Sequence, residues 1–276
     1  MVFRSIRKGG LWGFPLFLLA TSAILTSGGL TMAVPKGDYA RPELLIEPQE
    51  LKDLLDRKEP SIRVIDIRDR LKYHAGHIPG ALHVWRPDIV DKDHPMPGMM
   101  ASQAQIEALM GRLGIQETDT LVIYSDGPDN ARLWWVLAYY GFPIAQMKLL
   151  DGGIDGWKEK GYPTELLSPK VSQTRFRLPG RSKGREHLLC DLPQVKEALH
   201  DTRKVVLDVR SKREYLGEET LQGAVRPGRI PGVVWIEWKE TLIPDGPYKG
   251  YWKPAEEIRK IFSSRGITPD KDVYMY

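Results

Sequence analysis

Val64-Ile65-Asp66-Ile67-Arg68 is the most informative stretch of this chain, because it occurs a second time as Val206-Leu207-Asp208-Val209-Arg210. Each stretch is short, apolar and rich in β-branched residues, a pattern typical of a strand buried on both faces of a parallel sheet. Each ends in an aspartate and an arginine. We therefore predict one α/β unit that is repeated in tandem.

The repeat continues on the C-terminal side of both strands. Tyr73 recurs as Tyr215 at the same offset (208 − 66 = 142), and His77-Ile78-Pro79-Gly80 recurs as Arg229-Ile230-Pro231-Gly232 at a larger one (230 − 78 = 152). The second copy thus has ten additional residues (152 − 142) around positions 217–228. The larger offset then holds to the last residue, so that Tyr124 pairs with Tyr276.

Helices alternate with strands in both copies. Residues 48–55 and 193–199 open with a proline, which suits the first turn of a helix. Residues 103–113 and 255–262 have apolar residues three and four apart, and 131–140 forms a further apolar helix. The next strands are expected at 121–124 and 273–276. This alternation predicts an α/β fold in which each copy is a mainly parallel sheet with helices on both faces.

The repeat also suggests where the domains begin and end. We expect a first copy at residues 44–166, a linker rich in Lys, Arg, Pro and Gly at 167–186, and a second copy at 187–276. By comparison with the first copy, the second lacks its reactive loop, the following helix, and the last strand and helix. We expect the second domain to be incomplete and the sequence to be part of a longer chain, because ending on a central strand would leave an open sheet edge.

The N-terminal residues 1–34 are predicted to be a signal peptide or an N-terminal anchor. Arg4, Arg7 and Lys8 precede a largely apolar run at 11–25, and Thr31-Met32-Ala33 resembles a cleavage site. The longer run 11–34 is long enough to span a bilayer, but its glycines favour a cleaved signal. We expect an exported protein, periplasmic or secreted, that contacts a membrane only through this segment if it stays uncleaved.

The composition excludes several classes of protein. With 276 residues, 42% hydrophobic and 28% charged, the chain resembles a soluble globular protein. Its net charge of +4 suits a small anionic substrate and is too weak to indicate nucleic acid. A single cysteine, Cys190, excludes a disulfide framework. His74, His77 and His83 fit no metal-binding template, so we expect neither a metal nor a cofactor.

Ligands of parallel α/β sheets bind beyond the carboxyl ends of the strands, next to helix N-termini. In the first copy this place belongs to the loop Ser125-Asp126-Gly127-Pro128-Asp129-Asn130, between the strand at 121–124 and the helix that carries Arg132. Such a loop binds an anion or lowers the pKa of a cysteine at its start.

Together with this loop, four motifs of the first copy resemble the rhodanese family. They are Asp66-Ile67-Arg68, Gly76-His77-Ile78-Pro79-Gly80-Ala81, Leu150-Asp151-Gly152-Gly153, and Trp157 with Gly161 and Pro163. Asp208-Val209-Arg210 and Gly228-Arg229-Ile230-Pro231-Gly232 are the equivalents in the second copy. The resemblance implies an inactive first domain and a catalytic second one. It also implies transfer of a sulfane sulfur from thiosulfate or a similar small anionic donor, through a cysteine persulfide, to cyanide or a thiol.

The sequence departs from the family at the reactive position. Active rhodanese domains have a cysteine where this chain has Ser125, and a serine without an adjacent base is a poor nucleophile. Asp126 and Asp129 would also repel an anionic donor. We therefore expect the first-copy loop, including Ser125, Asp126, Gly127 and Asn130, to be catalytically silent. The equivalent position of the second copy directly follows Tyr276, where we expect a cysteine, so the 276-residue chain lacks the nucleophile.

Other residues have two interpretations each. The resemblance implies that Arg210 helps to bind the anionic donor, whereas an ion pair with Glu214 or Asp208 is the alternative. Cys190 aligns with Ile46 and is interpreted as a small buried apolar residue. Tyr248, Tyr251 and Trp252 either line a substrate entrance near the boundary of the two copies or serve ordinary packing.

Three functions are compatible with these features. The first is an exported sulfurtransferase. The alternative is a noncatalytic rhodanese-like binding or sensor protein, which would have Ser or Asp after Tyr276. A phosphatase or arsenate reductase would need the same cysteine, but tandem copies behind an exported start make it less consistent with this sequence.

Overall fold

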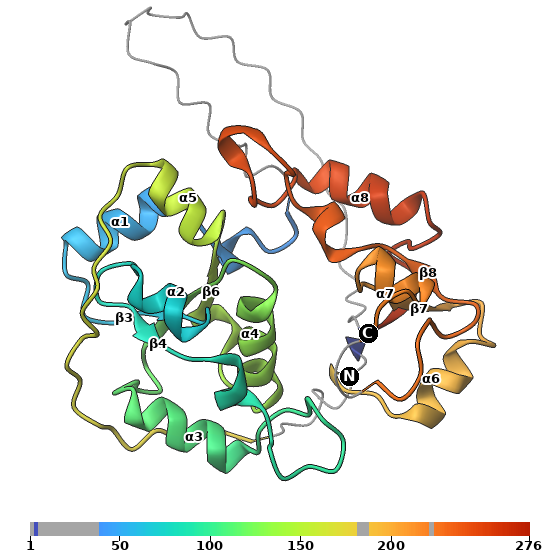
Figure 1. Cartoon of the computed structure of the whole chain (residues 1–276), viewed down its shortest axis with the longest axis horizontal. Coiled ribbons are helices and arrows are strands. Elements are labelled where there is room, and N and C mark those ends of the chain that lie inside the picture. The colour runs from blue at the N-terminus through green and yellow to red at the C-terminus, as the bar shows by residue number, and fades with distance from the viewer. Residues whose placement is uncertain (1–2, 5–38, 181–187, 221–223) are drawn as a thin grey trace, which may run out of the picture.

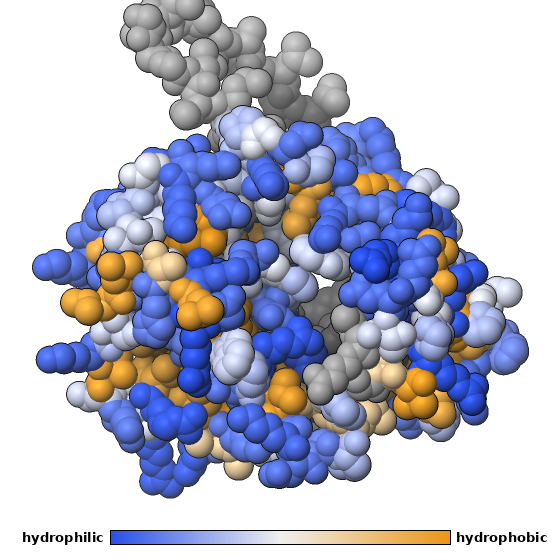
Figure 2. Space-filling model, in the orientation of Figure 1, coloured by the Kyte–Doolittle hydropathy of each residue, from blue (hydrophilic) through white to orange (hydrophobic). Residues whose placement is uncertain are grey.

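The computed structural model describes residues 3–4, 39–180, 188–220 and 224–276 and contains two separate sheets, one in each copy (Figure 1). The first copy lies on the left of Figure 1 and the second on the right. The surface seen in Figure 2 is mainly hydrophilic with scattered apolar residues, as is usual for folded proteins.

The first sheet has five strands, and all of its neighbouring strands run parallel. Across the sheet these are β2 (Leu45–Ile46), β6 (Met147–Leu150), β5 (Thr120–Tyr124), β3 (Ile62–Asp66) and β4 (Leu82–His83).

Helices cover both faces of this sheet, as the sequence predicts. Val64 and Val122 point to the face covered by α1 (Pro48–Asp56) and α5 (Gly153–Glu159). Ile65 and Ile123 point to the face covered by α3 (Gln103–Arg112) and α4 (Asp129–Tyr139). Successive strand residues thus enter opposite cores, which explains the uninterrupted apolar runs. Shorter helices complete the copy: η1 (Pro42–Leu44), α2 (Arg70–His74), η2 (Arg86–Ile89) and η3 (Ile144–Gln146).

The second sheet has the order β1-β9-β7-β8. The strands β9 (Asp272–Met275), β7 (Lys204–Asp208) and β8 (Val234–Trp235) are parallel, whereas β1 (Phe3–Arg4) pairs antiparallel with β9. Val206 packs toward α6 (Leu192–Ala198) and Leu207 toward α8 (Ala255–Ser263) on the other face. Shorter helices within the described part of this copy are α7 (Lys212–Leu216), η5 (Trp238–Thr241) and η6 (Gly246–Tyr248).

The segment predicted to be a surface linker is in part a component of the first copy. Phe176 and Leu178 are 1% and 6% exposed and belong to the core around α3 and α4. The backbone N–H of Thr174 donates to the carbonyl of Gly111 in α3 at 2.9 Å. A Cβ at Gly111 would lie 2.7 Å from the Thr174 oxygen, so this close approach requires glycine. Residues 181–186 of the predicted linker lie outside the described residues.

The predicted signal or anchor at 1–34 lies outside the described residues except for β1. In the part of the chain that the structure describes, no helix combines the length and apolar character needed to cross a bilayer.

The two copies contact each other through the loop that precedes α8. Tyr251 is 1% exposed, and its ring packs against Gly152, which directly precedes α5, and against Gly156 within α5. The backbone N–H of Trp252 donates to the Asp151 carboxylate at 2.9 Å. Of the two interpretations of these aromatic residues, the structure therefore shows packing between the copies for Tyr251.

Candidate functional site

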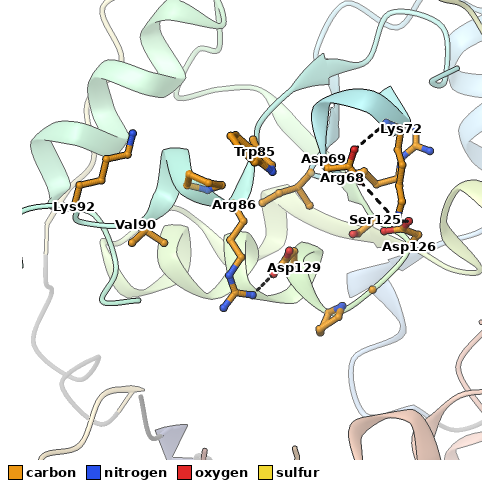
Figure 3. Close-up of a pocket in the computed structure, with 14 residues that line it drawn as sticks. Arg68, Asp69, Lys72, Trp85, Arg86, Val90, Lys92, Ser125, Asp126 and Asp129 are labelled. Carbon is orange, nitrogen blue, oxygen red and sulfur yellow. Dashed lines mark hydrogen bonds and ion pairs between the residues drawn. The ribbon is translucent and has the colours of Figure 1, made fainter. Parts of the chain in front are cut away.

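A pocket of about 560 Å³ lies at the carboxyl edge of the first sheet, where the loops after β3 and β5 meet η2 (Figure 3). Ser125, Asp126 and Gly127 of the predicted reactive loop line it. The structure thus places this loop at the sheet edge where the sequence predicts a ligand site.

The end of β3 is held by a buried polar cluster. The Asp66 carboxylate accepts hydrogen bonds from the Arg68 backbone N–H at 2.9 Å, from its Nε at 3.0 Å and from its Nη2 at 2.6 Å. The guanidinium also donates to the Gly76 carbonyl at 2.8 Å. The Tyr124 hydroxyl donates to Asp66 at 2.7 Å and accepts from the Ile78 N–H at 3.1 Å. This cluster fastens the loop after α2 to the central strands and leaves Arg68 little freedom to bind a ligand.

The second copy repeats this cluster. The Asp208 carboxylate accepts from the Arg210 backbone N–H and Nε, each at 3.0 Å, and from its Nη2 at 2.7 Å. The same guanidinium donates to the Gly228 carbonyl and lies 5.1 Å from the centre of the Tyr276 ring. The Tyr276 hydroxyl accepts from the Ile230 N–H at 3.2 Å. Equivalent residues therefore make equivalent contacts in both copies.

Arg210 therefore forms the ion pair with Asp208 that the sequence left open as an alternative. The hydrogen bond from Arg210 to this carboxylate raises the pKa of the guanidinium, which stays charged. Its side chain is 27% exposed, compared with 4% for Arg68. A role of Arg210 in binding the donor stays a prediction.

The loop of the first copy is tied to both walls of the pocket by its own aspartates. Asp126 accepts a hydrogen bond from Lys72 of α2, and Asp129 accepts one from Arg86 of η2 (Figure 3). The hydrogen bond to Asp126 raises the pKa of Lys72. The four side chains are between 26% and 54% exposed, so solvent screens these pairs and each contributes only about 0–1 kcal/mol to stability.

Ser125 and the residues that follow it show how this loop enters α4. Ser125 is 7% exposed, and α4 begins behind Pro128 without a side-chain cap. The Asn130 side chain accepts from the backbone N–H of Ala131 at 2.8 Å. No histidine is among the residues that line this pocket, and the lining carboxylates of Asp126 and Asp129 are hydrogen-bonded to Lys72 and Arg86. That Ser125 is catalytically silent stays a prediction.

Two cationic groups near the pocket are not paired with a carboxylate among the described residues. Lys92 lines the pocket and is exposed. Arg132 of α4 donates to the Gly98 carbonyl, but its Nε is buried without a hydrogen-bond partner in the described part of the chain. Burial and the neighbouring charge of Arg86 lower the pKa of Arg132.

Sequence reasoning missed the wall residues Lys72, Trp85 and Arg86. They come from the short helix α2 and from the segment that enters η2, which have no strong sequence pattern. The repeat offsets would have found their equivalents, which are Glu214, Glu237 and Trp238. The Trp238 N–H donates to the Val209 carbonyl at 3.0 Å, so this residue borders the carboxyl end of β7 as Arg86 borders that of β3.

The other predicted positions lie apart from the pocket. Cys190 is half-buried and packs against the α6 face of the second sheet, together with Val195 and Tyr274. Within the described residues, no three His, Cys, Asp or Glu side chains come together as a metal site. His77 stacks on the Tyr73 ring with 3.8 Å between ring centres.

Comparison with known proteins gives consistent results. Residues 47–160 match the rhodanese-like domain family. The chain is 34% identical over 252 residues to the sulfur carrier protein TtuD of Thermus thermophilus. The aligned region covers 86% of this chain and 83% of that protein. It is 30% identical over 241 residues to the thiosulfate sulfurtransferase of Azotobacter vinelandii, with coverage of 86% and 83%.

A similar fold is found among solved structures. SseA from Escherichia coli, a 3-mercaptopyruvate sulfotransferase, superposes with a TM-score of 0.70 at 24% identity, covering 83% of this chain and 86% of that one. This likeness concerns the fold and extends over both copies.

Proposed function

This chain belongs to the rhodanese family, and from that premise we propose that the protein is a sulfurtransferase whose nucleophile is a cysteine directly after Tyr276. The donor is thiosulfate or a similar small anion, and the acceptor is cyanide or a thiol. The named activities of the relatives support sulfur transfer as the reaction class.

The observation that carries this proposal is the equivalence of Tyr124 and Tyr276. Each tyrosine hydroxyl accepts a hydrogen bond from the backbone N–H of the isoleucine in an Ile-Pro-Gly motif. The distance is 3.1 Å from Ile78 and 3.2 Å from Ile230. The first residue after Tyr124 is Ser125, which lines the pocket. A residue that follows Tyr276 in a longer chain would begin in the same place, at the carboxyl edge of the second sheet.

The proposed reaction has two steps. The cysteine thiolate attacks the outer sulfur of thiosulfate, the S–S bond of the donor breaks, and sulfite leaves with the electron pair. Cyanide then attacks the outer sulfur of the resulting persulfide, forms thiocyanate and restores the thiolate. Backbone N–H groups of a loop entering a helix lower the pKa of such a thiol and stabilise the persulfide anion.

The first copy has a different role in this proposal. Ser125 occupies the reactive place, no histidine lines its pocket, and the aspartates beside it carry negative charge and are paired with Lys72 and Arg86. We propose that this domain is catalytically silent and supports the second copy through the contact of Tyr251 with α5.

The test is a thiosulfate–cyanide assay on the chain continued past Tyr276. We expect thiocyanate formation that is abolished when the residue after Tyr276 is changed from Cys to Ser and kept in Ser125→Ala. A Ser or Asp encoded there would instead support the alternative, a noncatalytic rhodanese-like binding or sensor protein.

We also propose that the protein is exported, because positive residues precede an apolar run within residues 1–34. Fractionation of cells that produce the full chain tests this. We expect the protein outside the cytoplasm with residues 1–34 removed or membrane-bound, and its recovery in the cytoplasm with an intact N-terminus would contradict export.

A further inference from the structure

The pocket of the first copy is lined by several cationic side chains, as an anion-binding site would be. Its cationic groups come from three places in the fold: Lys72 from α2, Arg86 from η2, and Lys92 from the loop after η2. A fourth group, Arg68, is already neutralised by Asp66. A cavity of about 560 Å³ with several cations on its walls is large enough for a small oxyanion.

The loop supplies the negative charge itself. Asp126 reaches Lys72 on one wall, and Asp129 reaches Arg86 on another (Figure 3). Asp69 adds a third carboxylate, 3.8 Å from the Lys72 Nζ. The two loop aspartates thus occupy the hydrogen-bonding positions at which Lys72 and Arg86 would contact an incoming anion.

We propose that the first-copy pocket is a latent site for a small tetrahedral oxyanion, the class that includes sulfate and thiosulfate, and that Asp126 and Asp129 keep it closed. The carboxylates act in two ways. They neutralise the two cations, and their charge repels an anion that approaches the loop. The first copy then leaves such anions free for another site in the molecule.

The surroundings support this assignment. Removing the two loop charges would leave Arg86 and Lys92 without a carboxylate partner among the described residues, and Lys72 with only Asp69 at 3.8 Å. The Arg132 Nε is a buried donor without a hydrogen-bond partner in the described chain. These side chains would then form a positive pocket, whereas in the native protein Lys72 and Arg86 each have a carboxylate partner in the loop.

The experiment uses sulfate, which has no sulfane sulfur, so its outcome does not depend on the proposed reaction. Sulfate binding is measured by isothermal titration calorimetry at low ionic strength for the native chain and for Asp126→Asn/Asp129→Asn. We expect at least about tenfold tighter binding in the variant, the factor that corresponds to about 1.4 kcal/mol. The gain should shrink as the ionic strength rises.

Two controls separate this site from a general charge effect. Asp56→Asn/Glu256→Gln removes the same number of charges from exposed helical ion pairs elsewhere and should bind sulfate like the native chain. Arg86→Gln added to the loop variant should abolish the gain. Circular dichroism verifies the fold, and each single variant, Asp126→Asn or Asp129→Asn, gives an intermediate gain should the double variant fail to fold.

Two results would overturn the proposal. One is equal affinity of the native chain and the loop variants. The other is a gain that survives Arg86→Gln or appears equally in the Asp56→Asn/Glu256→Gln control.

Discussion

At the scale of single residues, the burial of the Asp66 carboxylate requires hydrogen-bond donors around it. The carboxylate is 0% exposed. An isolated buried carboxylate is costly, and here Arg68 and Tyr124 supply the donors that offset its desolvation. The same reasoning applies to Asp208 and Arg210. The aspartate and arginine of both motifs are therefore explained by folding before any role in binding is considered.

Tyr124→Phe should lower the free energy of unfolding of the first copy by about 1–3 kcal/mol. The change leaves the Ile78 N–H without its acceptor and removes one donor from Asp66. Urea unfolding measures the effect. Tyr162→Phe is the control, because its hydroxyl bonds to Gln49 at an exposed position, and an equal loss in both variants would contradict this role of Tyr124.

The partly buried hydroxyl of Tyr276 should make the stability of the second copy depend on pH. Burial raises the pKa of Tyr276 to about 12, from a value of 10.0 in the absence of the protein environment. Because the folded value is the higher one, the contribution of the neutral phenol is complete below about pH 10 and is lost as the pH rises through about 12. The stability of the native chain should therefore fall more steeply over this range than that of Tyr276→Phe. Parallel curves in chemical denaturation would refute this.

At the scale of elements, the close packing of Tyr251 on α5 explains why glycines stand at two positions of this segment. Gly152 has a φ of +73°, and a Cβ there would lie 2.2 Å from the Tyr251 ring. Gly156 lies within the helix, and a Cβ there would lie 2.6 Å from the Tyr251 hydroxyl. The motif Gly152-Gly153-Ile154-Asp155-Gly156 thus forms a surface that the loop of the other copy can approach closely.

Gly156→Ala tests this contact, because the contact decides whether the substitution raises or lowers the free energy of unfolding. In a helix without such a contact, the change stabilises by about 0.5–1 kcal/mol. Here we expect destabilisation of about 1–3 kcal/mol from overpacking against Tyr251. Thermal unfolding of Gly156→Ala, Tyr251→Ala and the double variant measures it. Stabilisation by Gly156→Ala in the native background, or the same loss with Tyr251 absent, would contradict the packing argument.

Most of the elements could be predicted because their pattern is local. The apolar runs at 64–67 and 205–209 mark β3 and β7, although both strands end at the aspartate, where the side chain turns to bind its arginine. Phe176 and Leu178 could not be placed, since a mainly polar composition conceals two core residues. The partners of Lys72 and Arg86 could not be predicted either, because those contacts join segments far apart in the chain.

On the scale of the whole molecule, two copies with the same strand-end cluster differ in the residues beside that cluster. The first copy continues into a loop with serine and two aspartates, which its pocket walls neutralise. The second has Glu237 and Trp238 where the first has Trp85 and Arg86, and the Trp238 N–H donates to the Val209 carbonyl just beyond β7. These differences are the reason for proposing that sulfur transfer takes place in the second copy, at a residue other than Ser125 and Cys190.

The most direct test of this assignment is the intact mass of the protein after incubation with thiosulfate, because a persulfide adds one sulfur atom. We predict no added sulfur on the 276-residue chain, whose sole thiol is the half-buried Cys190. On a chain that continues past Tyr276, we predict one added sulfur, mapped to the next residue. A persulfide on Cys190 of the 276-residue chain would contradict the assignment.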